Sequence, residues 1–421
     1  MIDVKDLLKN PEKYKNALKD RGYENVNLVE EIVELKEKIN LLIKKRDDLR
    51  AFINKFFETK PDEETIKILR EKKKEIKKIE DELDSLQKLL EEKLDLIPNV
   101  PASEVPRGKD EKDNVVLRSW GEIPQFDFIP QDHVDLGKEY DLIDTEKAGK
   151  VAGARFYYLK NEAVLLEIAL IKFVFDTLIP YGFTPIIPPY FIKEKYYRGM
   201  GRITGADREE RYYLEKDELF LIGSAEHTIG PYHADEILEE DELPKRYLGF
   251  SPCFRREAGS YGKDVRGILR THQFEKIEMF SFTLPEKSEE EHQFLLSLEE
   301  KIIQLLKIPY RVIFICTGDM GRTDYKQYDI EAWFPGQGKY RETHSCSNTT
   351  DYQARGINAR FRRKDGKIEY LHMLNATALA IGRAIVAILE NYQRKNYIEI
   401  PEVLIPYLGF EKIEKRKNEK I

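Results

Sequence analysis

Residues 27–97 carry two heptad patterns that strongly limit how this part of the chain can fold. In the first, apolar residues recur at alternating spacings of four and three, with Arg46 at one position: Leu28, Ile32, Leu35, Ile39, Leu42 and Leu49. After a break near residues 59–62, the pattern resumes with Ile66, Leu69, Ile76, Ile79, Leu83, Leu86 and Leu90. Such spacing forms one apolar seam on each helix, and two seams of similar length can bury each other. We therefore predict an antiparallel helical hairpin, a coiled-coil arm about 45 Å long, with Pro61 at the start of its second helix.

The arm has charged outer faces and ends at a proline-rich segment. Lysines cluster at 72–74 and 77–78, and the sequence 97–101 reads Ile-Pro-Asn-Val-Pro. Residues 98–114 are polar and contain several prolines and glycines, which is typical of a linker. With 421 residues, the chain is also too long for one ordinary core. We predict an N-terminal domain over 1–110, with the arm at 27–97, and a second domain over 111–421.

Composition excludes several classes of protein. No apolar run approaches the roughly 20 residues of a membrane span, and the first residues lack an apolar signal core. The three cysteines, Cys253, Cys316 and Cys346, are far apart and lack metal-site spacing. These features predict a cytoplasmic protein that does not enter a membrane. The net charge of −7 argues weakly against a surface coated in nucleic acid, but a local basic surface remains compatible with it.

The second domain is predicted to have an α+β fold. Aromatic and β-branched segments at 183–187, 248–254, 274–282 and 310–316 alternate irregularly with helical stretches. Regular strand–helix–strand alternation and a glycine-rich phosphate loop are both missing from the sequence. This pattern favours an antiparallel sheet with helices packed against it.

Two separated segments place arginines where one anionic ligand could meet both. Arg255 follows the strand-like run that ends at Phe254, and Arg383 is the one basic residue in a small-residue apolar helix. Guanidinium groups bind phosphate through paired hydrogen bonds, although Arg255 could equally form an ion pair with Glu257 or Glu278. Because side chains alternate along a strand, Glu278 should share a face with Phe274.

Three further segments combine hydroxyl, amide and carboxylate groups. Ser224 and Glu226 follow an apolar run. A hydroxyl and a carboxylate in this position suit recognition of a small positively charged group, although Ser224 could instead cap a helix. Glu342 and Ser345 offer the hard oxygen ligands that Mg²⁺ prefers, although ordinary loop chemistry would also explain them. Thr377, which shortly precedes the Arg383 helix, could be a cap or could face a ligand.

Together these segments resemble class II aminoacyl-tRNA synthetases, and specifically the common bacterial type of seryl-tRNA synthetase. The resemblance runs from end to end and preserves the family's order of motifs. It covers the hairpin, Ser224–Glu226, the 254–278 segment, the 341–348 segment and the 375–391 helix. It implies a class II antiparallel sheet flanked by helices, preceded by the coiled-coil arm.

The resemblance also implies roles for individual residues. Arg255 and Arg383 would be the catalytic pair, on the α-phosphate and the γ-phosphate of ATP, and Glu342 with Ser345 would ligate Mg²⁺. Phe274 would stack on the adenine. The implied ATP-binding residues are Arg255, Arg256, Glu257, Thr271, His272, Gln273, Phe274, Glu342, Thr343, His344, Ser345 and Arg383. The implied serine-binding residues are Ser224, Ala225, Glu226, Arg255, Glu278, Asn375 and Thr377.

By the same resemblance, the activity would be ATP-dependent ligation of L-serine to tRNA(Ser) through a seryl-adenylate, with tRNA(Sec) as a second candidate substrate. The helix before Pro180 and the segment 183–188 would form the interface of a homodimer. The arm would bind the long variable arm of the tRNA across that dimer. Two alternatives remain from the sequence: a ligase that loads a carrier protein, whose relatives lack the arm, and a non-catalytic paralogue.

Two positions depart from the family pattern. Ser224 stands where threonine is usual, so the hydroxyl is kept and a methyl group is lost. His344 stands where an aliphatic residue is usual, beside the expected metal ligands.

Overall fold

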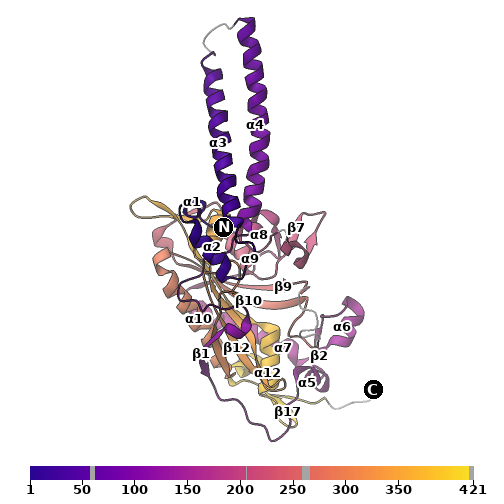
Figure 1. The fold of residues 1–421 in the computed structure, drawn as a ribbon. Helices are drawn as coiled ribbons and strands as arrows, with labels where there is room; N and C mark the ends of the chain where they lie inside the picture. Colours follow the sequence, from indigo (N-terminus) through magenta and orange to yellow (C-terminus); the bar gives the residue numbers. More distant parts are fainter. Residues whose placement is uncertain (57–61, 205, 258–265, 417–421) are drawn as a thin grey trace. The chain divides into compact units, whose positions relative to one another are not determined.

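The computed structural model describes residues 1–421 except 57–61, 205, 258–265 and 417–421 (Figure 1). The chain divides into two compact units, Met1–Val100 and Pro101–Ile421. The predicted start of the second arm helix at Pro61 lies outside the described residues.

The first unit contains the predicted hairpin. Helices α3 (Leu28–Asn54) and α4 (Glu63–Asp95) lie side by side (Figure 1). The Asp62 carboxylate caps α4 by accepting a hydrogen bond of 2.8 Å from the Thr65 backbone N–H. Two ion pairs, Glu31 with Lys93 and Lys38 with Glu82, join early residues of α3 to late residues of α4. The helices are therefore antiparallel, and the coiled-coil arm is confirmed.

The heptad residues nearest the base of the hairpin form its core. Ile32, Leu35 and Ile39 of α3 are buried, as are Ile79, Leu83 and Leu90 of α4. Two short helices, α1 (Val4–Lys9) and α2 (Pro11–Asp20), complete this unit and bury Leu7 and Leu18.

The second unit is built on an eight-stranded sheet in the order β1-β11-β12-β13-β16-β10-β9-β4. Its neighbouring strands are antiparallel except for the parallel pair β4 and β9. The strands are β1 (Val115–Trp120), β4 (Phe183–Ile186), β9 (Lys245–Phe254), β10 (Gln273–Thr283), β11 (Tyr310–Phe314), β12 (Lys326–Phe334), β13 (Lys339–Asn348) and β16 (His372–Ala380). The predicted α+β class with a largely antiparallel sheet is confirmed.

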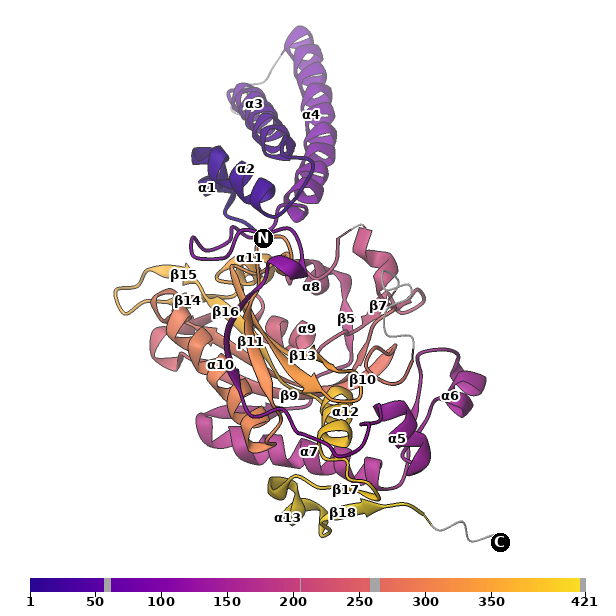
Figure 2. The ribbon, with the colours of Figure 1, turned by 60° about the horizontal axis from the view of Figure 1, so that its bottom comes forward.

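Three long helices pack against this sheet. Helices α10 (Ser288–Leu305) and α12 (Ile381–Asn391) contact the central strands, and α7 (Glu162–Leu178) contacts β9 and α12 (Figure 2). Ile277 and Met279 of β10 are fully buried in the core that includes Leu295 and Ile302 of α10. Because side chains alternate along a strand, Phe274, Lys276 and Glu278 project from the opposite face of β10.

Smaller elements surround the sheet. Among the described residues, four small sheets have the orders β2-β3, β5-β7-β6, β15-β14-β8 and β17-β18. Their strands are β2 (Ile143–Asp144), β3 (Tyr158–Leu159), β5 (Phe191–Lys193), β6 (Tyr213–Leu214), β7 (Leu219–Leu221), β8 (Ile237–Glu239), β14 (Arg360–Arg362), β15 (Ile368–Tyr370), β17 (Tyr397–Glu399) and β18 (Lys412–Glu414). The shorter helices are α5 (His133–Glu139), α6 (Thr145–Ala152), α8 (Glu194–Gly199), α9 (Glu226–Ile229), α11 (Tyr352–Ile357) and α13 (Ile405–Leu408). Within the described residues, no helix has the length and apolar character needed to cross a membrane.

Candidate active site

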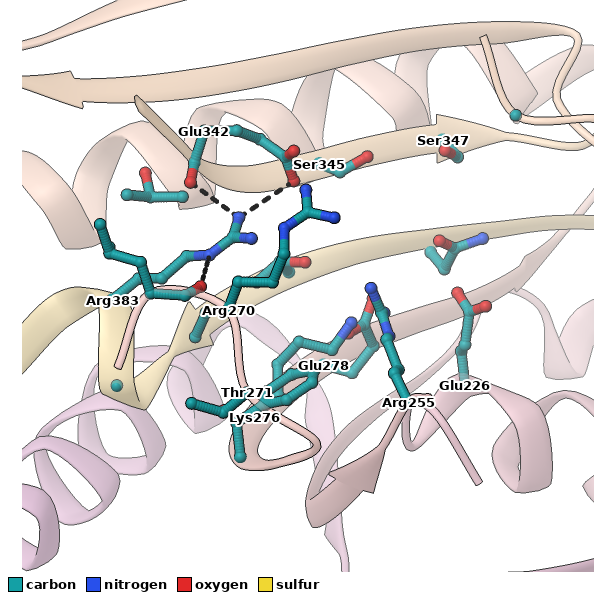
Figure 3. Close-up of a pocket in the computed structure, with 18 of the residues that line it drawn as sticks. Glu226, Arg255, Arg270, Thr271, Lys276, Glu278, Glu342, Ser345, Ser347 and Arg383 are labelled. Carbon is teal, nitrogen blue, oxygen red and sulfur yellow. Dashed lines mark hydrogen bonds and ion pairs between the residues drawn. The ribbon is translucent and has the colours of Figure 1, made fainter. Parts of the chain in front are cut away.

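A cavity of about 380 Å³ opens on the face of the sheet that α10 and α12 do not cover. Its wall combines strands β10, β13 and β16 with the first turn of α12 and several loops (Figure 3). Twelve of the residues predicted from the sequence line it: Glu226, Arg255, Glu257, Thr271, Phe274, Glu278, Glu342, Thr343, Ser345, Asn375, Thr377 and Arg383. The fold therefore gathers residues that are up to 157 positions apart, from Glu226 to Arg383.

Arg255 lies just beyond the end of β9, over the aromatic ring expected to bind adenine. Its Nε donates a hydrogen bond of 3.1 Å to the Gly223 carbonyl, and its guanidinium lies 5.3 Å from the centre of the Phe274 ring. The acidic residues considered as its ion-pair partners have other cations close by. Arg270 lies 2.9 Å from Glu257, and Lys276 lies 2.5 Å from Glu278.

Arg383 reaches the cavity from the first turn of α12 (Figure 3). Its Nη1 donates a hydrogen bond of 2.7 Å to the Glu342 carbonyl and lies 3.3 Å from the carboxylate of the same residue. Its Nε donates to the Leu269 carbonyl at 3.4 Å. These contacts attach the helix terminus to both β13 and the loop before β10.

A β-bulge brings Glu342 and Ser345 to the same cavity. Residues three apart on a regular strand face opposite sides of the sheet. Here Ile330 and Glu331 of β12 are consecutive, but they pair with His344 and Glu342 of β13, so Thr343 is the extra residue. The bulge changes the alternation of side chains, which lets both oxygen-bearing residues reach the cavity.

The other end of the cavity contains two buried carboxylates, Glu226 and Glu278. Burial alone would raise the pKa of Glu226, but Arg202, whose Nε lies 2.8 Å away, and His227 outweigh it and hold that pKa well below its usual value. Burial also raises the pKa of Glu278, an effect that the Lys276 ammonium opposes and the Glu226 charge reinforces. Two carboxylates in different electrostatic environments therefore face one small polar subsite.

Strand β16 adds an amide and a hydroxyl to this end. Asn375 and Thr377 are buried and line the cavity two residues apart, as alternation along a strand requires. The Asn375 Nδ2 has no hydrogen-bond partner among the described residues. Because a buried donor without a partner is costly, this amide is well placed to bind a polar ligand.

Six predicted site residues do not line the cavity. Ser224 is buried and its hydroxyl donates to the carboxylate of Glu278, and Ala225 belongs to a buried apolar cluster that also contains Ile229. The guanidinium of Arg256 lies 5.1 Å from the Tyr212 ring, and the His272 Nδ1 lies 3.1 Å from the Arg255 carbonyl. Gln273 is exposed on the opposite face of β10 from Phe274, because neighbouring side chains alternate.

His344 also points away from the cavity. It is buried next to Leu379, Ala384 and Ala387, on the side of β13 that faces α12, and its Nδ1 lies 2.8 Å from the Thr343 hydroxyl. Burial lowers the pKa of the ring to about 3. The strand alternation that directs Ser345 into the cavity directs its neighbour His344 into the core.

Sequence reasoning missed several charged residues of the wall. Lys276 could have been found, because it lies midway between Phe274 and Glu278 on a strand whose alternation was recognised. Arg202, Arg270 and Asp324 lie in loops without periodicity. No spacing rule connects such residues to the site, and the fold alone brings them there.

The fold matches that of class II aminoacyl-tRNA synthetases. Residues 211–392 match the family model described as "tRNA synthetase class II core domain (G, H, P, S and T)". A prolyl-tRNA synthetase structure from Giardia lamblia, in complex with prolyl-adenylate, shares the fold at a TM-score of 0.57 and 14% identity, covering 65% of this chain and 54% of its own.

Comparisons over the full length are more specific. Residues 1–101 match the seryl-tRNA synthetase N-terminal domain. A serine–tRNA ligase of Dictyoglomus turgidum is 49% identical over 99% of this chain and 100% of its own. The structure of seryl-tRNA synthetase from Pyrococcus horikoshii complexed with ATP has a TM-score of 0.90 and 43% identity, covering 99% of this chain and 100% of its own. This chain belongs to the seryl-tRNA synthetase family.

Proposed function

We propose that this protein joins L-serine to tRNA(Ser) in an ATP-dependent reaction. The observation that carries the proposal is the placement of two arginines from separate elements, Arg255 and Arg383, in one cavity with the buried pair Glu226 and Glu278. The arginines supply positive charge for a triphosphate, and the carboxylates supply negative charge for an ammonium group. Serine-tRNA ligases similar to this chain over nearly its whole length, and a relative solved with ATP, support this reading.

In this proposal the adenine of ATP stacks on Phe274, with Glu257 at its edge. Arg255 contacts the α-phosphate and the serine carboxylate, and Arg383 contacts the γ-phosphate. The existing contact of the Arg255 guanidinium with the Phe274 ring, at 5.3 Å, supports this arrangement because it holds cation and aromatic ring together. The adenine that would meet Phe274 and the α-phosphate that would meet Arg255 are likewise close to each other in ATP.

Glu342 and Ser345 fit a magnesium ion. Mg²⁺ is usually held by one or two protein oxygens together with substrate phosphates, and the β13 bulge presents this pair of oxygens to the cavity. When bound, the ion would neutralise charge on the phosphates as pyrophosphate leaves. Arg383 lies 3.3 Å from Glu342, so a magnesium ion held by Glu342 and Ser345 would add its charge close to that of the arginine.

The serine would lie at the opposite end, with Glu226 binding its ammonium group and Glu278 its hydroxyl. Asn375, Thr377 and the hydroxyl of Ser224 complete this pocket in the proposal. The unpartnered Asn375 amide supports it, because a bound polar substrate would supply the missing hydrogen bond.

The chemistry then needs no covalent enzyme intermediate. One oxygen of the serine carboxylate attacks the α-phosphorus, the bond to the β-phosphate oxygen breaks, and pyrophosphate leaves to give seryl-adenylate. A ribose hydroxyl at the tRNA 3′ end next attacks the seryl carbonyl, and AMP leaves. The protein contributes orientation of the carboxylate and stabilisation of charge by Arg255 and Arg383.

The rest of the chain has proposed roles in binding the tRNA and a second subunit. We assign tRNA binding to the N-terminal domain, 1–110, with its arm at 27–97, and catalysis to 111–421. The match of residues 1–101 to the family's N-terminal domain supports this role and disfavours a ligase without an arm. Homodimer formation through α7 is supported by its exposed apolar side chains Val164, Leu165 and Ile168. We also propose that the protein acts in the cytoplasm.

Serine-dependent exchange of pyrophosphate into ATP tests the proposal. The wild-type protein should exchange with serine and far less with alanine. The Arg255→Ala variant should lose about 100-fold or more in kcat/KM, because contacts to charged groups are worth up to about 3 kcal/mol each. Arg362→Ala is a matched control, since Arg362 pairs with Glu239 on a small sheet away from the cavity. Near wild-type exchange by Arg255→Ala would refute the assignment.

A further inference from the structure

His227 directly follows Glu226 and has a different partner at each ring nitrogen. The Gly223 N–H lies 3.1 Å from Nδ1, and the Glu226 Oε1 lies 3.3 Å from Nε2. The ring is buried and packs on Tyr197, with ring centres 4.8 Å apart. His227 does not line the cavity itself.

These contacts define the state of the ring. A backbone N–H can only donate, so Nδ1 accepts and the ring proton is on Nε2, which lies 3.3 Å from the Glu226 Oε1. Burial lowers the pKa of His227 to about 3, against the opposing effect of the Glu226 charge. The ring is therefore neutral near pH 7, and it binds Glu226 without cancelling its negative charge.

Arg202 contacts the same carboxylate oxygen. Its Nε lies 2.8 Å from the Glu226 Oε1, so both contacts fall on one oxygen of the carboxylate. Glu226 projects into the cavity beside Arg255 (Figure 3). A carboxylate held by Oε1 has its second oxygen, Oε2, in a defined position before a ligand arrives. Such pre-organisation reduces the conformational entropy lost on binding.

We propose that His227 is a positioning residue that holds Glu226 through Oε1, so that Oε2 meets the ammonium group of the amino-acid substrate. The inference rests on the proposed function, because it takes Glu226 as the ammonium ligand. His227 contacts Glu226 directly but reaches Arg255 only through the backbone of Gly223, so its loss should weaken the affinity for serine far more than the affinity for ATP.

Two substitutions separate this role from simple packing. His227→Phe keeps a ring against Tyr197 but removes the polar contacts with both Gly223 and Glu226. His227→Gln keeps a side-chain amide N–H at about the distance of Nε2, so it can still donate to Glu226. In serine-dependent pyrophosphate exchange, His227→Phe should raise KM for serine about 10-fold or more and leave KM for ATP within about twofold. His227→Gln should restore KM for serine to within about threefold of wild type.

A matched control is His292→Phe. His292 is also a buried ring, with its Nε2 3.0 Å from the Cys346 carbonyl and Tyr328 alongside, but it lies on α10 away from the cavity. This variant should lower the melting temperature without changing the ratio of the two KM values. If His227→Phe does not fold, His227→Asn replaces it, because its shorter amide can accept from Gly223 but cannot reach Glu226.

Each outcome decides the question. An unchanged KM for serine in His227→Phe or its replacement, an equal rise in both KM values, or failure of His227→Gln to rescue would overturn the positioning role. Absence of serine-dependent exchange in the wild-type protein would refute the proposed function instead, and the two failures are thereby distinguished.

Discussion

Ser224 forms hydrogen bonds with both acidic residues of the proposed serine pocket. Its hydroxyl donates to Glu278 at 3.2 Å and accepts from the Glu226 backbone N–H at 3.3 Å, at the start of α9. The sequence left open whether this serine supports a helix terminus or a ligand pocket. The structure shows that one hydroxyl contacts both the helix and a carboxylate of the cavity. A threonine here would add only a methyl group to the same hydrogen bonds.

We expect Ser224→Thr to keep serine activation and to lower threonine activation. The added methyl should fill the space that a threonine substrate would need, and one methyl group in a pocket is usually worth about 1–3 kcal/mol. The measurement is kcat/KM for serine and threonine in both proteins. If the serine-to-threonine ratio does not change, position 224 does not shape the pocket.

His344 should be dispensable for ATP binding, although it adjoins the residues proposed to bind metal. Its side chain is buried in the core against Leu379 and Ala384, on the far side of the strand from the cavity. We expect His344→Leu to leave KM for ATP within about twofold of wild type, because an aliphatic side chain suits that apolar site. A rise of tenfold or more, with the melting temperature unchanged, would show that the ring acts on the nucleotide site.

Sequence patterns predicted individual helices and strands of the fold but not how these elements assemble. Heptads predicted α3 and α4, and aromatic and β-branched runs predicted β4, β9, β10 and β11. The order of the sheet could not be read in this way, since β10 pairs with β16 nearly 100 residues further along the chain. Pairing between distant strands depends on which faces of the strands are buried against each other, and local periodicity gives no information about this.

The same limit applies to the site. Residues such as Arg255, Phe274 and Arg383 were assigned to one site because the motifs that contain them resemble those of a known family. The approach of Arg202 to Glu226 depends on a loop, and the shared orientation of Glu342 and Ser345 depends on a bulge that adds Thr343 to β13. Loops and bulges break the periodicity on which prediction rests.

The arm is expected to serve tRNA binding alone. Replacing residues 27–97 with a short linker should abolish tRNA charging and leave serine-dependent pyrophosphate exchange near the wild-type rate. The described residues that line the cavity all belong to the second unit, so we expect adenylate formation to proceed without the arm. Charging by the intact protein should also weaken with added salt, because lysines that contact an RNA backbone release counterions. Charging by the deletion variant at a similar rate would show that the arm is only structural.

For the molecule as a whole, buried histidines link stability to pH. Burial lowers the pKa of His227 and His344 to about 3 and that of His292 to about 4, from a usual 6.5. At a pH between the lowered pKa of a histidine and its usual value of 6.5, the unfolded chain binds a proton there that the folded chain does not. Falling pH therefore favours unfolding, by at most about 1.4 kcal/mol per pH unit for each group.

His292 provides a test of this linkage outside the active site. In His292→Gln the side-chain amide can still donate to the Cys346 carbonyl, but nothing titrates at this position. Between pH 7 and pH 5, the free energy of unfolding of His292→Gln should therefore fall by about 2 kcal/mol less than that of the wild type. Denaturant titrations at pH 7 and pH 5 measure the free energy of unfolding. Between pH 7 and pH 8, this free energy should change by the same amount in both proteins. Equal losses at acid pH would mean that His292 is protonated in the folded protein.

The most direct test of the central claim is aminoacylation of total tRNA by the purified protein, with ATP and with serine, threonine or alanine in turn. We expect serine to be attached to tRNA at a rate far above that of threonine or alanine. Alanine should be rejected by about 10⁴-fold, because the buried Glu278 would be left without a substrate hydroxyl. Failure to load serine onto any tRNA, or loading of alanine at a comparable rate, would contradict the account.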